Sequence, residues 1–199
     1  GKAFADKTVL VSGGTVVLES RGGNVVQAAG AGVNVSGASG GGDAGRFEIR
    51  AADGTATLGG TLSGHAGGGD AAGGEFALYA GSVADLSALA GQLGAGGFDA
   101  GVDVRARSGD MMLGAGTTLK SHKVSLAADD GNLTVAGTID ASGAKGGRID
   151  LYANRGATAG SGILTLAGTA LLKANATETL AKASGTRGEG GSVTLGVSA

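Results

Sequence analysis

A short strand-like phrase recurs along the chain and constrains the fold more than any other feature. Apolar residues alternate with polar or small ones in residues 47–51, 76–80, 102–106, 124–128 and 149–153, with a shorter copy at 193–195. Period-two alternation predicts strands with one buried face. The phrases begin roughly 20 to 30 residues apart except across the last, longer interval, which we interpret as a repeat unit carrying an insertion.

A unit of this length cannot bury its apolar face alone, so we expect successive units to stack into a solenoid. The predicted fold is all-β, a right-handed parallel β-helix with one or two short helical or loop insertions, and residues 1–199 form one β-helical segment. Stacking places one aliphatic side chain per unit in a buried ladder: Ile49, Leu78, Val104, Leu126, Leu151 and Leu195. The row beside it is expected to face solvent: Glu48, Ala77, Asp103, Ser125, Asp150 and Thr194.

A second apolar phrase follows within most units, on both sides of a small-residue pair such as Gly-Thr. It occurs in residues 58–62, 113–119, 135–139 and 166–171, and its alternation predicts a further strand. Glycine-rich corners follow at 36–41 and 142–147, where we expect positive φ angles that turn the chain onto the next unit.

Two segments depart from the repeat. Residues 82–91 begin with Ser82 and Asp85 at capping-box spacing and continue with apolar residues at helical intervals, which predicts a short helix or helical loop. Residues 169–183 tolerate a helix as well, but their first half continues the strand phrase. We interpret them as a strand followed by a loop that protrudes up to Gly191.

Composition removes several classes of protein. The chain has 44 glycines, no proline and 42% hydrophobic residues, which fits neither collagen nor a disordered polymer. The net charge of −2 and the scattered basic residues argue against a nucleic-acid partner. The absence of cysteine excludes disulfides and thiolate metal ligands, and we expect no cofactor and no metal site.

Residues 133–153 and 162–196 resemble repeats in the large exoproteins of the filamentous haemagglutinin family. The phrases Gly-Thr-Ile-Asp-Ala-Ser-Gly and Leu-Thr-Leu-Ala-Gly-Thr carry the resemblance. It implies a right-handed parallel β-helix, exported by two-partner secretion through an outer-membrane pore, that acts in adhesion, biofilm formation or contact-dependent competition. The Asn-Pro motifs of the family's secretion domain cannot occur in a chain without proline. The segment is therefore expected to belong to the shaft or a distal module, with the cognate transporter recognised by a region outside this chain.

The resulting functional hypothesis is a structural and adhesive shaft segment, without enzymatic activity, of a larger secreted protein at the bacterial surface. Its expected partner is a host or bacterial surface receptor or a polysaccharide. Open solenoid ends expose unpaired strand edges, so we also expect end-to-end self-association.

Two alternative functions would place a site on the outer surface of the strands. Tyr79, Arg105 and Tyr152 fall in one outward column, and exposed tyrosine and arginine suit a carbohydrate-binding module. Asp103 and Asp150 fall two strands apart, about 9.6 Å by strand spacing, within the range of an inverting polysaccharide hydrolase. A polysaccharide lyase on the same face belongs to this second alternative.

Other motif matches are interpreted as accidents of composition. Residues 40–45 satisfy the phosphate-binding spacing G-x-G-x-x-G, but a strand rather than a helix is predicted after them. Residues 142–145 match the S-x-x-K acylation motif inside a predicted turn. His65 and His122 stand far apart in the sequence with no second ligand motif.

Overall fold

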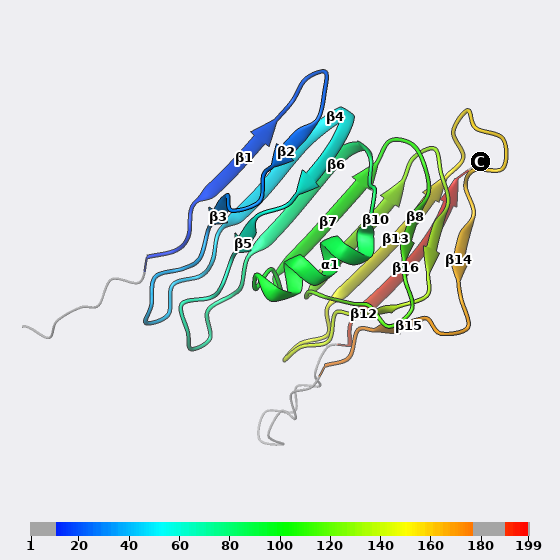
Figure 1. The fold of residues 1–199 in the computed structure, drawn as a ribbon. Coiled ribbons are helices and arrows are strands. Elements are labelled where there is room, and N and C mark those ends of the chain that lie inside the picture. The colour runs from blue at the N-terminus through cyan, green and yellow to red at the C-terminus, as the bar shows by residue number, and fades with distance from the viewer. Residues whose placement is uncertain (1–10, 177–189, 199) are drawn as a thin grey trace, which may run out of the picture.

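The computed structural model describes residues 11–176 and 190–198, which form a parallel β-helix (Figure 1). One long sheet contributes a strand to every coil, in the order β1-β4-β6-β7-β10-β13-β16. Its strands are β1 (Thr15–Glu19), β4 (Arg46–Leu58), β6 (Glu75–Ser82), β7 (Gly101–Ala106), β10 (Lys123–Ala128), β13 (Arg148–Asn154) and β16 (Ser192–Ser198). All pairings in this sheet are parallel, which confirms the predicted fold class.

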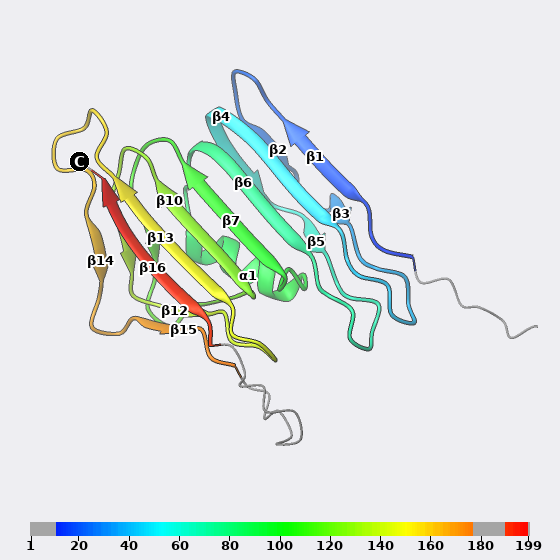
Figure 2. The same cartoon turned by 180° about the vertical axis from the view of Figure 1, so that it is seen from behind.

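The coil is right-handed. In Figure 2 the long sheet faces the viewer with its strands pointing upward, the chain returns behind it, and successive coils advance from right to left. This is the hand that parallel crossovers adopt almost without exception, because it suits the right-handed twist of the strands.

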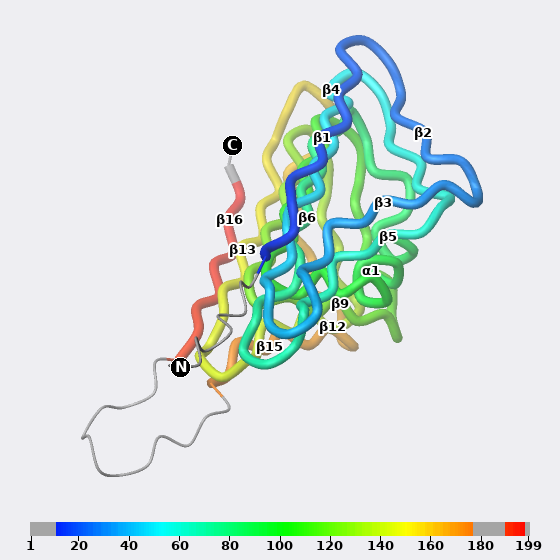
Figure 3. The backbone as a smooth tube through the Cα atoms, turned by 90° about the vertical axis from the view of Figure 1, so that its left-hand side faces the viewer, coloured from blue at the N-terminus to red at the C-terminus, as the bar shows by residue number. Residues whose placement is uncertain are grey.

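Shorter sheets close the other sides of the coil. Figure 3 looks along the stack and shows β2, β3, β5 and the helix on the side away from the long sheet. Strands β2 (Val25–Gln27), β3 (Gly32–Asn34) and β5 (Thr61–Ser63) serve the first coils. The later coils use β8 (Met111–Leu113), β9 (Thr118–Lys120), β11 (Leu133–Val135), β12 (Thr138–Asp140), β14 (Leu164–Leu166) and β15 (Leu171–Lys173).

The buried ladder has the register expected from the sequence. Each of the six aliphatic residues pairs with the next across the long sheet: Ile49, Leu78, Val104, Leu126, Leu151 and Leu195. The first five are buried, but Leu195 is 49% exposed, so its expected burial is wrong. In the described part of the chain no further coil stacks over β16, and its inward side chains therefore have neighbours on one side only.

Three phenylalanines widen the core next to the only helix in the described residues. Phe47, Phe76 and Phe98 are fully buried and pack edge to face, with ring centroids 5.7 and 6.2 Å apart. Edge-to-face packing is favoured because the ring edge is positive and the ring face negative. Smaller residues continue the same row, starting with Val102, which pairs with Phe76.

The predicted helix is present, but it begins later than the capping-box spacing suggests. Helix α1 spans Leu86–Ala95 and contacts β5, β8 and β9, so it replaces the short strands of its coil. Asp85 is the N-cap, and its carboxylate accepts a hydrogen bond of 2.8 Å from the Ala88 amide. Ser82 instead belongs to β6 and pairs with Thr55, because strand pairing continues to the end of β6.

The second apolar phrase is two strands rather than one, because the chain turns a corner at its small residues. Leu113 ends β8 and Thr118 begins β9, with Gly116 between them at φ 78°. At the corresponding corner of the next coil, a side chain at Gly137 would place its Cβ 2.5 Å from the Thr117 carbonyl oxygen. Alternation alone could not show the corner, since side chains on both sides of it still point into the same core.

The two glycine-rich corners use glycine for different reasons. At residues 36–41 the prediction is confirmed, because Gly40 and Gly41 have φ angles of 105° and 126°. At residues 142–147 no glycine has a positive φ, and the prediction is wrong. There the backbones of adjacent coils pack closely, and a Cβ at Gly147 would lie 2.1 Å from the His122 carbonyl oxygen.

Polar side chains at the corners link adjacent coils in a way that the sequence did not reveal. An Asn or Asp oxygen accepts a hydrogen bond from a backbone amide of the next coil, at 2.8 to 2.9 Å, in the pairs Asn24–Thr55, Asp43–Ala72, Asp110–Asn132 and Asn132–Ile163. These bonds satisfy amides that the short sheets leave unpaired. The strand after Thr169 is confirmed as β15, while the protruding loop lies largely outside the described residues.

Candidate binding face

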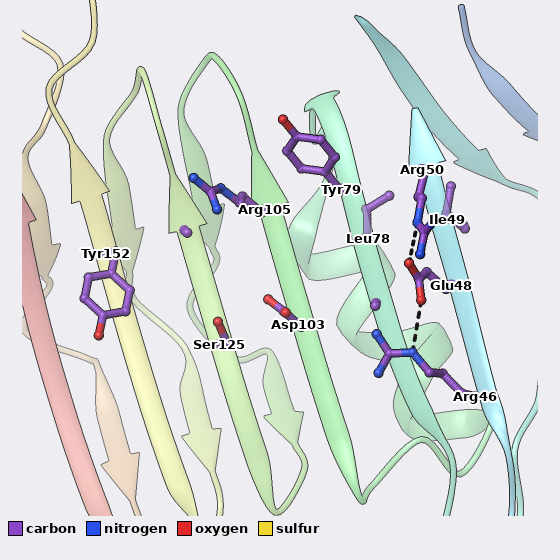
Figure 4. Close-up of a pocket in the computed structure, with 12 residues that line it drawn as sticks. Arg46, Glu48, Ile49, Arg50, Leu78, Tyr79, Asp103, Arg105, Ser125 and Tyr152 are labelled. Atoms are coloured by element: carbon purple, nitrogen blue, oxygen red, sulfur yellow. Dashed lines mark hydrogen bonds and ion pairs between the residues drawn. The ribbon is translucent and has the colours of Figure 1, made fainter. Parts of the chain in front are cut away.

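The outer surface of the long sheet is hollowed into a groove, shown in Figure 4. One hollow of about 480 Å³ extends from β4 to β13. A second of about 380 Å³ lies beside it and shares Arg46, Asp103 and Ser125 with the first. We call the two together the outer-face groove.

Side-chain size explains why this face is concave. Its floor is formed by small residues on β6, β7 and β10, namely Ala77, Gly101, Ser125 and Ala127, between which Tyr79, Asp103 and Arg105 project from the same strands. Longer side chains border it, with arginines and a glutamate on β4 and Arg148, Asp150 and Tyr152 on β13. Ala77 lies on the outer face as expected, but its larger neighbours leave it buried, so its expected exposure to solvent is wrong.

The three predicted binding residues lie along this groove. Tyr79 pairs with Arg105 across β6 and β7, and Ala127 separates Arg105 from Tyr152. Figure 4 shows the three side chains on the same outer face. Tyr79 is 37% exposed and Tyr152 is half-buried. The structure therefore brings together the three residues that the sequence singled out.

Arg105 is held by a carboxylate that the sequence did not connect to it. Its Nε donates to Asp129, which lies in the turn after β10, over 2.8 Å. This hydrogen bond raises the pKa of the guanidinium above its ordinary value. Because guanidinium carries five N–H donors, four of them stay available beyond this bond.

A row of ion pairs runs along β4. Glu48 accepts hydrogen bonds from Arg50 at 2.5 Å and Arg46 at 3.1 Å (Figure 4). Arg46 also donates to Glu75 at 3.2 Å. The Arg50 hydrogen bond, supported by the one from Arg46, lowers the pKa of Glu48. Glu48 was expected to face solvent but not to belong to a site, and Arg46 was not singled out, although the same period-two register places it on this face.

The two aspartates of the hydrolase alternative have different surroundings. Asp103 and Asp150 flank Ser125 in the register, as expected. Arg148 forms an ion pair with Asp150, whose Oδ1 is buried without a hydrogen-bond partner. Asp103 is exposed and forms no ion pair with any described residue. Only Asp103 therefore offers a carboxylate that is free to contact a ligand.

The remaining motifs lie elsewhere and form no site. Residues 40–45 lead into β4, so the helix N-terminus that a phosphate-binding loop requires is missing there. Across residues 11–176 and 190–198, no three acidic or histidine side chains gather closely enough to hold a metal ion. The described helix is too short to cross a membrane.

In comparisons with known proteins, no family model, curated protein or solved structure matches the chain.

Proposed function

We propose that this chain is a structural and adhesive shaft segment of a large secreted or surface-attached bacterial protein. The observation that carries the proposal is the continuous parallel pairing of the long sheet from β1 to β16. Each coil adds about 4.8 Å to the stack, so tandem coils convert sequence length into a fixed distance. A rigid spacer of this kind holds a distal binding region away from the cell.

Support for secretion and adhesion comes from the repeats at residues 133–153 and 162–196, which resemble those of filamentous haemagglutinin exoproteins. In this proposal a cognate outer-membrane transporter recognises a region outside the chain. The partners at the surface are a receptor or a polysaccharide of the host or of neighbouring bacteria.

Self-association is the second partner prediction. The inward side chains of β16, Val193, Leu195 and Val197, are about half-exposed, and its outer backbone edge is unpaired within the described residues. Such an edge can accept another strand. We expect sedimentation velocity to show concentration-dependent oligomers, which Leu195→Lys reduces. A monomer at every concentration would contradict this prediction.

Surface display tests the adhesive function. The chain is fused behind a two-partner secretion domain and produced with that domain's transporter in a non-adherent bacterial host. We expect protease-accessible chain at the cell surface and increased attachment of the cells to epithelial monolayers. Leu126→Asp, which places a charge in the core, should abolish the gain by preventing folding. Folded chain at the surface without any gain in attachment would refute the proposal.

A further inference from the structure

We propose that the outer-face groove binds an uncharged polysaccharide chain that runs across the strands, along the axis of the solenoid. This inference goes beyond the shaft function and does not depend on it. It rests on three features of the groove: its aromatic side chains, its hydrogen-bonding groups and the state of its charges.

Both tyrosines of the chain line the groove, whereas the described phenylalanines are all buried in the core. A tyrosine ring offers an apolar face and a polar hydroxyl, which matches a sugar ring with its C–H face and its hydroxyl groups. Tyr79 and Tyr152 lie three strands apart, about 14 Å by strand spacing, which suits a ligand several sugar units long rather than a single sugar.

Gly196 positions the second tyrosine. It pairs with Tyr152 across β13 and β16, and a Cβ on Gly196 would lie 2.5 Å from the Tyr152 ring. The absence of a side chain therefore lets the ring lie down over β16. This is a positioning role, because Gly196 itself offers no group for a sugar to contact.

The charges of the groove identify the ligand as uncharged. Each of four arginines along it already has a carboxylate partner: Arg46, Arg50, Arg105 and Arg148. Of the charged lining residues, only Asp103 and Lys123 form no ion pair with described residues, and their charges are opposite. An acidic polymer would find no excess of free cations here. A neutral polymer can use the remaining N–H donors and carboxylate lone pairs without breaking an ion pair.

Affinity electrophoresis of the complete chain tests this inference. Native gels contain either a neutral polymer (dextran, galactomannan or xyloglucan) or the acidic polygalacturonate. We expect at least one neutral polymer to retard the chain and polygalacturonate to have no effect. Titration calorimetry with the retarding polymer should give similar affinities at low and high salt, because salt screens only charge-driven binding. Retardation by polygalacturonate alone, or by no polymer, would overturn the inference.

Variants locate the binding. Tyr79→Ala combined with Tyr152→Ala should weaken binding about tenfold or more, as expected for the loss of two aromatic contacts. Gly196→Ala should also weaken it, because the ring of Tyr152 must move. Met112→Ala removes an exposed side chain on β8, outside the groove, and serves as the matched control. If the double variant folds poorly, the affinity of the single variant Tyr79→Ala tests the site instead. Unchanged affinity in the folded tyrosine variants would place the ligand elsewhere and refute the proposed site.

Discussion

Leu126 lies in the middle of the buried ladder, between Val104 and Leu151, and has no exposed surface. Leu126→Ala should lower the free energy of unfolding by about 2 to 5 kcal/mol, because it removes buried methyl groups and leaves a cavity between two rigid coils. Chemical denaturation followed by circular dichroism measures the change.

Leu195→Ala is the matched control, since it makes the same substitution in the same ladder at a half-exposed position. Leu195→Ala should lower the free energy of unfolding by about 1 kcal/mol, because less buried apolar area is lost at this position. An equal loss of unfolding free energy in Leu126→Ala and Leu195→Ala would contradict the deeper burial of Leu126.

The sequence predicts a residue's face better than its burial. Period two fixes which side chains of a strand point inward, and parallel stacking then aligns them, so the register of the ladder and of Tyr79, Arg105 and Tyr152 follows from alternation. Exposure depends on neighbours in other coils, which is why Ala77 and Leu195 were misjudged. The Arg105–Asp129 pair also escaped prediction, because Asp129 lies in a turn that no periodic pattern describes.

At the scale of the elements, the start of α1 gives a sharp test. Asp85→Ala should destabilise the protein by about 1 kcal/mol, because the Ala88 amide loses its side-chain acceptor. Ser82→Ala, at the position favoured by the capping-box spacing, should have little effect, since Ser82 continues strand β6. Chemical denaturation of the two variants measures the difference. A larger loss of stability in Ser82→Ala than in Asp85→Ala would show that the helix begins earlier.

Element types could be predicted, but several of their ends could not. The long-sheet strands and the helix follow from apolar spacing, whereas the corners within the Gly-Thr phrases depend on the close approach of two backbones. Gly137 shows this, because its lack of a side chain matters only once the Thr117 carbonyl lies beside it. The hydrogen bonds that Asn24 and Asp110 accept from backbone amides of the next coil could not be predicted from the sequence for the same reason.

At the scale of the whole molecule, we predict that acid weakens the fold. The pKa of Glu48 is lowered by its arginine partners, and that of Asp130 by hydrogen bonds from Thr158. Both carboxylates are therefore more acidic folded than unfolded. Their contribution to stability is complete above the ordinary values of 4.5 and 3.8 and is lost as the pH falls through the lower folded values.

The melting temperature should accordingly fall as the solution is acidified below about pH 4.5, the ordinary value of Glu48. Glu48→Gln combined with Asp130→Asn should flatten this dependence, which differential scanning calorimetry can follow. A melting temperature that rises with acidification would contradict the assigned hydrogen bonds.

The fold requires that sequence-distant units stack in one register, and disulfide trapping can detect this stacking because the chain has no cysteine of its own. Asp103 and Ser125 are register partners on the outer face of β7 and β10. Strand spacing puts their Cα atoms about 4.8 Å apart, within the span of a disulfide. The control pair, Arg105 and Ser125, faces the same way but lies two residues out of register, about 8 Å apart, too far to bridge. Under mild oxidation, Asp103→Cys with Ser125→Cys should form an intramolecular disulfide detected by mass spectrometry, and Arg105→Cys with Ser125→Cys should not. Equal cross-linking of both pairs, or cross-linking of the control pair alone, would contradict the stacked register.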